Sequence, residues 1–198
     1  MNTPVDTVRP SRWTQREIVV VAAIGVFFGV VYLAWVQAWL VARALIGPIS
    51  LDIFFGLWCV ASPVAAYIIR KPFAAFGAEM IAAIAEVATG NPAGLILLLT
   101  GFVQGAGAEL PFALTRWKNY SWAVMIASGV TAALFSFAYT WVRFKYGDLS
   151  PGLLAVMLSV RITSGILLAS VLGRFIAEGL YRTGVLDGLA IDDAKRGR

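Results

Sequence analysis

A few ionisable and amide side chains interrupt long apolar stretches of this sequence. They are Glu79, Glu86 and Glu109, accompanied by Gln104 and Arg161. Because a charge in hydrocarbon is energetically expensive, such residues by default line a binding site, carry protons or neutralise one another. Glu79 and Glu86 are seven residues apart, so they share one face of a helix. The pattern predicts a polar interior within a set of apolar helices.

One structural explanation for these charges is an internal ion pair. Arg161 lies at a depth compatible with Glu86 or Glu79, and either pair would neutralise both partners. Three glutamates against one arginine within the apolar stretches still leave acidic groups over, and these need protons or a bound cation. Surplus negative charge favours a positively charged or amine-bearing ligand.

Aromatic side chains could form the walls of such a pocket. Trp35 and Trp39 are four residues apart and share one helix face, while Trp58 and Tyr139 belong to other apolar stretches. An interfacial aromatic belt explains Trp39 equally well, but Trp35 and Trp58 lie too deep for a belt. With the carboxylates they predict a site for a flat or cationic ligand, held by stacking and cation–π attraction.

The stretch around Gln104 is rich in small residues. Gly101, Gly105 and Gly107 could let neighbouring helices approach closely, or could leave room for a ligand beside Gln104. Pro111 in the same stretch should kink the helix and free a carbonyl for another partner.

The composition predicts that membrane-spanning helices position these residues. Of 198 residues, 60% are hydrophobic and 14% are charged, with a mean hydropathy of +0.80, whereas a soluble domain carries about 25% charged residues. A spanning helix needs about 20 residues, so six spans use nearly the whole chain. We expect an all-α bundle of six transmembrane helices over residues 18–44, 51–69, 72–90, 93–115, 121–144 and 151–181. Residues 1–17 form an N-terminal cytoplasmic segment, 18–182 the membrane domain, and 183–198 a polar cytoplasmic tail that we expect to fray.

The distribution of basic residues predicts the orientation. With the N-terminus inside, three basic residues fall outside, namely Arg43, Arg143 and Lys145. The inside segments hold Arg9, Arg12, Arg16, Arg70, Lys71, Arg116, Lys118, Arg182, Lys195, Arg196 and Arg198. The positive-inside rule therefore places both ends in the cytoplasm. This pattern explains the net charge of +5 without a nucleic-acid partner.

Several kinds of chemistry are excluded. The chain has no histidine, and Cys59 is its single cysteine, so an internal disulfide, a Cys/His metal cluster and histidine catalysis are impossible. The sequence contains neither a phosphate-binding loop nor a nucleophile elbow. We expect no enzyme activity, no metal and no cofactor. Uphill transport would need coupling to an ion or ATPase partners.

The middle of the chain resembles a known family. The segments are residues 65–72 (AAYIIRKP), 77–83 (GAEMIAA) followed by Glu86, 90–95 (GNPAGL) and 101–109 (GFVQGAGAE). They resemble the YkoE family of substrate-binding S components of energy-coupling-factor (ECF) importers, linked to thiamine or its hydroxymethylpyrimidine precursor. The resemblance implies a multi-pass protein of a bacterial plasma membrane with an outward-opening site. It also implies a transmembrane coupling protein and two cytoplasmic ATPases as partners.

The resemblance also implies roles for individual residues. The substrate-binding residues would be Glu79, Glu86, Asn91, Gln104, Glu109, Trp35, Trp39, Trp58 and Tyr139. A glutamate would balance the thiazolium or accept from the pyrimidine amine, and a tryptophan would stack. Ala22, Gly25 and Gly29 on the first helix would face the coupling protein, and the connection between Arg43 and Ser50 would close the site.

Two other functions remain open from the residues alone. One is a stand-alone secondary transporter in which protons exchange on Glu79, Glu86 or Glu109; broken helices and inverted repeats would support it. The other is an assembly protein whose charges only hold helices together. Ligand binding by the isolated protein, without ATP or an ion gradient, would separate the first function from both.

Overall fold

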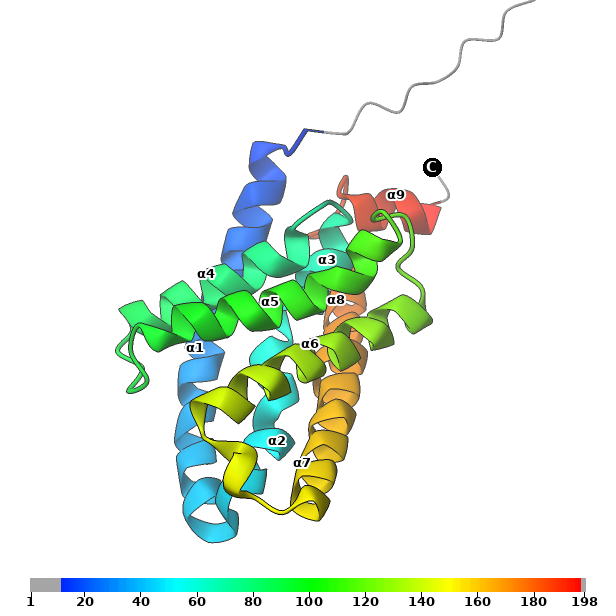
Figure 1. The fold of residues 1–198 in the computed structure, drawn as a ribbon. Coiled ribbons are helices and arrows are strands. Elements are labelled where there is room, and N and C mark those ends of the chain that lie inside the picture. Colours follow the sequence, from blue (N-terminus) through cyan, green and yellow to red (C-terminus); the bar gives the residue numbers. More distant parts are fainter. Residues whose placement is uncertain (1–11, 197–198) are drawn as a thin grey trace, which may run out of the picture.

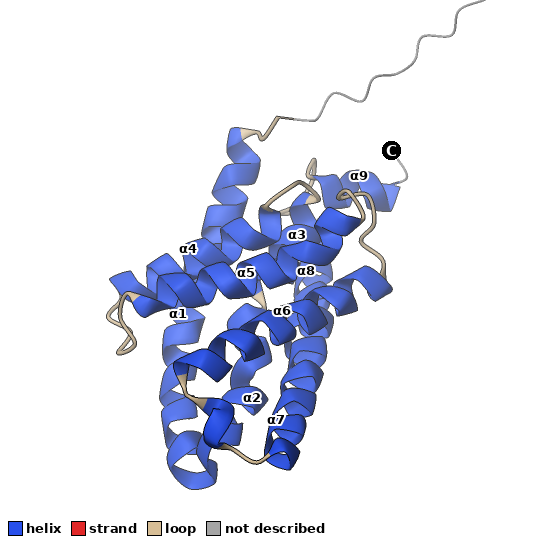
Figure 2. Ribbon diagram, viewed as in Figure 1, coloured by secondary structure: helices blue, strands red, loops and turns tan. Residues whose placement is uncertain are grey.

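The computed structural model describes residues 12–196, and these fold into helices without a strand (Figures 1 and 2). Most of the expected N-terminal segment 1–17, with Arg9, lies outside the described residues, as does Arg198. The first helix, α1, spans Gln15–Ile46. It begins with a capping box, in which Thr14 Oγ1 accepts from Glu17 N while Thr14 N donates to Glu17 Oε2. It ends at Gly47, whose φ of 71° favours glycine.

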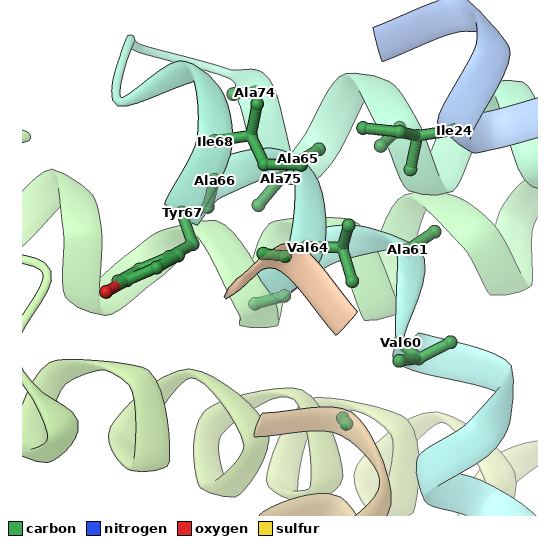
Figure 3. Close-up of a cluster of buried hydrophobic side chains, with 14 of the residues drawn as sticks. Ile24, Val60, Ala61, Val64, Ala65, Ala66, Tyr67, Ile68, Ala74 and Ala75 are labelled. Carbon is green, nitrogen blue, oxygen red and sulfur yellow. The ribbon is translucent and has the colours of Figure 1, made fainter. Parts of the chain in front are cut away.

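The segment that follows α1, which we call the second leg, runs back along α1 and is not one continuous α-helix. It comprises the 3-10 turn η1 (Gly47–Ile49), α2 (Ser50–Phe54), the 3-10 segment η2 (Phe55–Cys59) and α3 (Ala61–Ile69). Every residue of α3 is buried. Figure 3 shows its side chains packed between Ile24 of α1 and Ala74 and Ala75 of α4 (Ala74–Ala88). The core of the bundle therefore lies around α3.

Small residues bring the next helices together. These are α4, α5 (Ile96–Leu114) and α6 (Trp122–Arg143), which slant across the other rods in Figure 1. A Cβ added to Gly101 would lie 2.6 Å from Ala83 Cβ of α4, and one added to Gly107 would lie 2.9 Å from the Cα of Ala132 on α6. The glycines of α5 therefore serve close packing on both sides. Gly107 O, which lacks its helical donor because of Pro111, accepts from Thr131 Oγ1 at 2.6 Å, as the proline predicted.

The last long helical segment changes from α-helix to π-helix and back along its length. After the 3-10 turn η3 (Tyr146–Asp148), α7 (Pro151–Ser164) continues into the π-helical segment η4 (Gly165–Val171) and then α8 (Leu172–Arg182). Gly165 lies against Gly129 of α6, where an added Cβ would meet Gly129 O at 2.6 Å. Ser170 Oγ donates to Met125 O and accepts from Gly129 N. A serine hydroxyl thus ties the π segment to α6.

The C-terminal segment is folded, so the expected fraying is wrong for its described part. A short helix, α9 (Ala190–Arg196), lies against α3 (Figure 1). Leu186, Leu189 and Ile191 are buried, and Asp192 accepts a hydrogen bond from Gly188 N. Apolar residues spaced among the polar ones supply this contact.

Long apolar helices make this a multi-pass membrane protein. Four helical stretches among the described residues are long and apolar enough to cross a bilayer: Gln15–Ile69, Ile96–Leu114, Trp122–Arg143 and Pro151–Arg182. The first of them contains two antiparallel legs, α1 and η1–α3 (Figure 1). Helix α4, with 15 residues, is shorter than the roughly 20 that a perpendicular span requires.

Candidate substrate-binding site

A cavity of about 120 Å³ lies among α1, the second leg and α4 to α7; we call it the central cavity. Six residues expected to bind substrate line it: Trp39, Trp58, Glu86, Asn91, Gln104 and Tyr139. The helices bring these residues together from positions up to 100 apart in the sequence, Trp39 and Tyr139 being the most distant.

The polar wall of the central cavity is built on the turn after α4. Asn91 Nδ2 donates to Glu86 Oε1 at 2.7 Å, while Asn91 Oδ1 accepts from Ala93 N at 2.9 Å. The asparagine thereby fixes the orientation of the carboxylate. Within the described part of the chain, Glu86 Oε2 receives no hydrogen bond, so it is available to a donor in the cavity. Gln104 Nε2 lies 3.5 Å from Ser136 Oγ, a long contact that leaves its amide free to adapt.

The aromatic wall is already faced by arginines. Trp39 meets Trp58 edge to face with 5.8 Å between ring centroids, and the Arg43 guanidinium lies 5.3 Å from the Trp39 ring. Arg143 lies 5.8 Å from the Tyr139 ring. These contacts take up part of the cation–π capacity that a cationic ligand would use. The remaining ring surface favours a flat ligand over a cation.

An ion pair contributes to the wall of the central cavity through Arg161. Arg161 of α7 donates from Nε to Asp52 Oδ1 of α2 at 2.6 Å, and both side chains are fully buried. Arg161 Nη1 also donates to Thr140 Oγ1 at 2.7 Å. The expected pairing of Arg161 with Glu79 or Glu86 is therefore wrong. The reason is that α7 packs against α2 and α6, whereas both glutamates belong to α4.

Three residues expected to bind substrate lie outside the central cavity and have partners in the protein. Glu79 accepts from Ser62 Oγ at 2.9 Å. Trp35 Nε1 donates to Phe54 O at 3.1 Å. Glu109 accepts from Phe73 N at 2.7 Å, from Phe76 N at 3.1 Å and from Trp117 Nε1 at 2.6 Å. Its carboxylate satisfies orphan donors at the N-terminus of α4.

The glycines expected to face a coupling protein pack inside the chain instead. A Cβ added to Gly25 would lie 2.7 Å from Ile81 Cβ, and one added to Gly29 would lie 2.6 Å from Ala85 Cβ. Both glycines thus permit the close approach of α1 to α4. Ala22, one turn earlier, is half-buried.

Arg143, expected only as a charge outside the membrane, lines the central cavity from the last turn of α6. Its Nη1 lies 3.4 Å from Thr100 Oγ1 and 3.4 Å from the Tyr139 hydroxyl. The spacing of Tyr139 and Arg143, four residues apart on one helix face, was the signal that could have found it.

A second hollow of about 460 Å³ adjoins the central cavity, and we call it the vestibule. The two share Trp39, Leu51 and Phe144. Arg43, Pro48 and Ser50 line the vestibule, so the connection expected to close the site does border it. Lys145 and Asp148 supply further charges there.

The arrangement can hold a small, flat molecule with a hydrogen-bond donor directed at Glu86. Among the described residues no group of three histidine, cysteine, aspartate or glutamate side chains could hold a metal ion. Nothing in the cavity pairs a nucleophile with a base, so its groups suit binding.

Comparisons with known proteins agree with a transport function. The family described as "ABC-type cobalt transport system, permease component" matches residues 16–135. YkoE of Bacillus subtilis (strain 168), named as an HMP/thiamine permease protein, is 42% identical over 179 residues, which cover 90% of each chain. A crystal structure of an S-component of an ECF transporter is 41% identical and superposes with a TM-score of 0.91 over 94% of both chains. In sequence and in fold, the chain belongs to the YkoE family of ECF-transporter S-components, which are transport proteins and not enzymes.

Proposed function

We propose that this S-component captures thiamine, or its hydroxymethylpyrimidine precursor (HMP), outside a bacterial plasma membrane. It then delivers the ligand inward with a membrane-embedded coupling protein and two cytoplasmic ATPases. The name of the Bacillus relative, 42% identical, supports this ligand class. The similarity to an S-component supports the partners. The given sequence contains no phosphate-binding loop, so we assign ATP hydrolysis to the ATPases.

The Glu86–Asn91 pair carries the proposal for the ligand. An aminopyrimidine, common to both candidates, is a flat ring with an exocyclic amine beside a ring nitrogen. Glu86 Oε2 would accept from the amine, while the adaptable Gln104 amide would meet the ring nitrogen. Trp58 and Trp39 would cover the ring faces that the arginines leave open.

We further propose six membrane crossings with both chain ends in the cytoplasm. The vestibule with Arg43 and Lys145 would then be the outer mouth, while Lys71, Arg116 and Arg182 would lie on the inner side. Helix α4 would cross where α1 and α5 flank it. Of the residues expected to face the coupling protein, we retain Ala22, which lies near the exposed side chains of Val26 and Phe27 on α1.

The carboxylates support binding better than stand-alone proton exchange. Glu79 accepts from Ser62, and Glu109 accepts from two backbone N–H groups and an indole. Neither lines the central cavity, where a transported solute and a proton would have to be coupled.

Ligand binding to the purified protein tests the proposal. Titration in detergent, without ATP partners or an ion gradient, should quench tryptophan fluorescence with thiamine or HMP. Glu86→Gln should weaken binding at least tenfold, because a hydrogen bond to a charged group contributes about 1.5–3 kcal/mol. Glu178→Gln is the matched control, since Glu178 bonds Tyr67 and Arg174 far from the cavity. Absence of binding by the folded wild-type protein would refute the proposed ligands.

A further inference from the structure

The ion pair between Arg161 and Asp52 is incomplete. Arg161 and Asp52 meet through Nε and Oδ1 alone. Arg161 Nη2 and Asp52 Oδ2 are both buried and have no hydrogen-bond partner among the described residues. Leaving a buried donor and a buried acceptor unsatisfied costs free energy, and each such group needs a partner such as a water or a ligand atom.

The two unpartnered atoms are of opposite kinds and lie close to one another. Nε and Nη2 are on the same edge of the planar guanidinium, so Nη2 lies next to the bond that Nε makes with Asp52. Arg161 lines the central cavity, but its side chain and that of Asp52 have no exposed surface, so a ligand reaches this edge by displacing the side chains that cover it. The other amino group, Nη1, is held by Thr140. A group that both accepts and donates would satisfy Nη2 and Oδ2 together.

A hydroxyl has these two properties, and a phosphate dianion does not. An alcohol oxygen accepts from Nη2 while its proton is donated to Oδ2. A phosphate dianion has only acceptors to offer to Oδ2. It would also bring negative charge next to Asp52, which already neutralises Arg161, and into a cavity that contains Glu86. Such repulsion is strong where water is excluded.

The charges that line the vestibule would not discriminate between the alcohol and its phosphate ester. Arg43 and Lys145 line the vestibule and Arg143 lies in the wall below it, so anions are attracted there. Selection against a phosphate must therefore come from deeper groups.

We propose that Arg161 and Asp52 form a recognition subsite for a primary alcohol, so that the cavity selects the free alcohol over its phosphate ester. The inference concerns thiamine and rests on the proposed function. In thiamine the alcohol is at the end of the thiazolium side chain, well separated from the amine, so Glu86 on α4 can hold the amine while Arg161 on α7 and Asp52 hold the alcohol. In HMP the two groups are on adjacent ring carbons and would reach one subsite only. The importer would consequently take up unphosphorylated thiamine, which kinases of the cell must then phosphorylate.

Ligand variants test the subsite on the wild-type protein. The series comprises thiamine, its deoxy analogue with an ethyl in place of the hydroxyethyl group, and thiamine monophosphate. We expect loss of the hydroxyl to weaken binding about tenfold, the size of one hydrogen bond to a charged group, and phosphorylation to weaken it further. Equal affinities for the alcohol and the deoxy analogue, or for the alcohol and the ester, would overturn the subsite. Absence of binding by every ligand would instead overturn the proposed function.

A protein variant tests the charge argument separately. Asp52→Asn removes the carboxylate and leaves Arg161 unneutralised, so the ratio of alcohol to ester affinity should fall at least tenfold, mostly through tighter binding of the ester. Asp193→Asn removes an equal charge from the exposed side of α9, outside both hollows, and should leave the ratio unchanged. An unchanged ratio in folded Asp52→Asn contradicts the inference. If that variant does not fold, the ligand series on the wild-type protein still decides it.

Discussion

Replacing Glu109 by glutamine separates a structural carboxylate from a ligand-binding one. The side chain is 6% exposed and accepts from Phe73 N, Phe76 N and Trp117 Nε1. A glutamine keeps one acceptor oxygen, loses the charge and turns an N–H group towards one of these donors. Losing one charge-assisted hydrogen bond and weakening the others should lower the free energy of unfolding by about 3 kcal/mol. For a chain of this length that corresponds to a fall in Tm of roughly 6–12 °C.

The assay is thermal unfolding in detergent, followed by tryptophan fluorescence, together with ligand titration well below the lower Tm. Glu109→Gln should keep the wild-type Kd for thiamine or HMP, whereas Glu86→Gln should lose affinity with a smaller change in Tm. Thr131→Ser, which retains the hydroxyl that bonds Gly107 O, controls for substitution near α5. If Glu109→Gln weakened the ligand tenfold and left Tm unchanged, the reasoning that this residue only caps α4 would be refuted.

Two further predictions concern helix packing and the C-terminal segment. Gly29→Val places side-chain atoms against Ala85 Cβ and Ala82 O, and this overpacking should cost about 2 kcal/mol, a fall in Tm of roughly 4–8 °C. Gly179→Ala, with open space around it, should raise Tm slightly. The hydrogen bond from Gly188 N and the ion pair with Arg196 lower the pKa of Asp192 below 3.8. The stability that these contacts give the C-terminal segment is therefore present above that pH and is lost as the pH falls through the lowered pKa. Pepsin should therefore cleave the C-terminal segment faster below pH 3.8, and Asp192→Asn should expose it to trypsin at pH 7.5; equal trypsin cleavage of variant and wild type would contradict this.

Local rules predicted the helix ends well. The first span was expected over 18–44 and α1 spans Gln15–Ile46, while the last was expected to begin at residue 151 and α7 begins at Pro151. The carbonyl freed by Pro111 could also be predicted, because a proline affects its own helix whatever surrounds it. Such features depend on residues a few positions apart.

Partners across the bundle could not be predicted in the same way. Position along a helix gives the depth of Arg161 in the membrane but not the direction in which its side chain points. Asp52 begins the second expected span, 51–69, and Glu86 lies near the end of the third, 72–90, so both were expected towards the same side of the membrane and depth could not decide between them. The breaks at η2 and η4 add to the difficulty, since 3-10 and π segments turn the following residues away from the face that an α-helix would give them.

The sequence predicted that the candidate site would contain acidic, amide and aromatic side chains, but it did not predict which of these residues line it. Glu86 and Glu109 both interrupt apolar stretches, and the sequence offers no reason to separate them. What separates them is the start of α4, where Phe73 has a φ of 67° and exposes N–H groups that need an acceptor. Glu109, on α5, can serve as that acceptor only when α5 packs beside α4.

The contact between the first turn of α1 and the segment after α8 supports the proposal of six crossings. Arg16, in the first turn of α1, donates to Val185 O just beyond α8 at 3.4 Å. The first helix therefore starts on the face of the bundle at which the last long helix ends. A chain that leaves a bilayer on the side where it entered crosses it an even number of times. Reporter proteins fused to the two termini are therefore expected in one compartment, and reporters in opposite compartments would contradict the six proposed crossings.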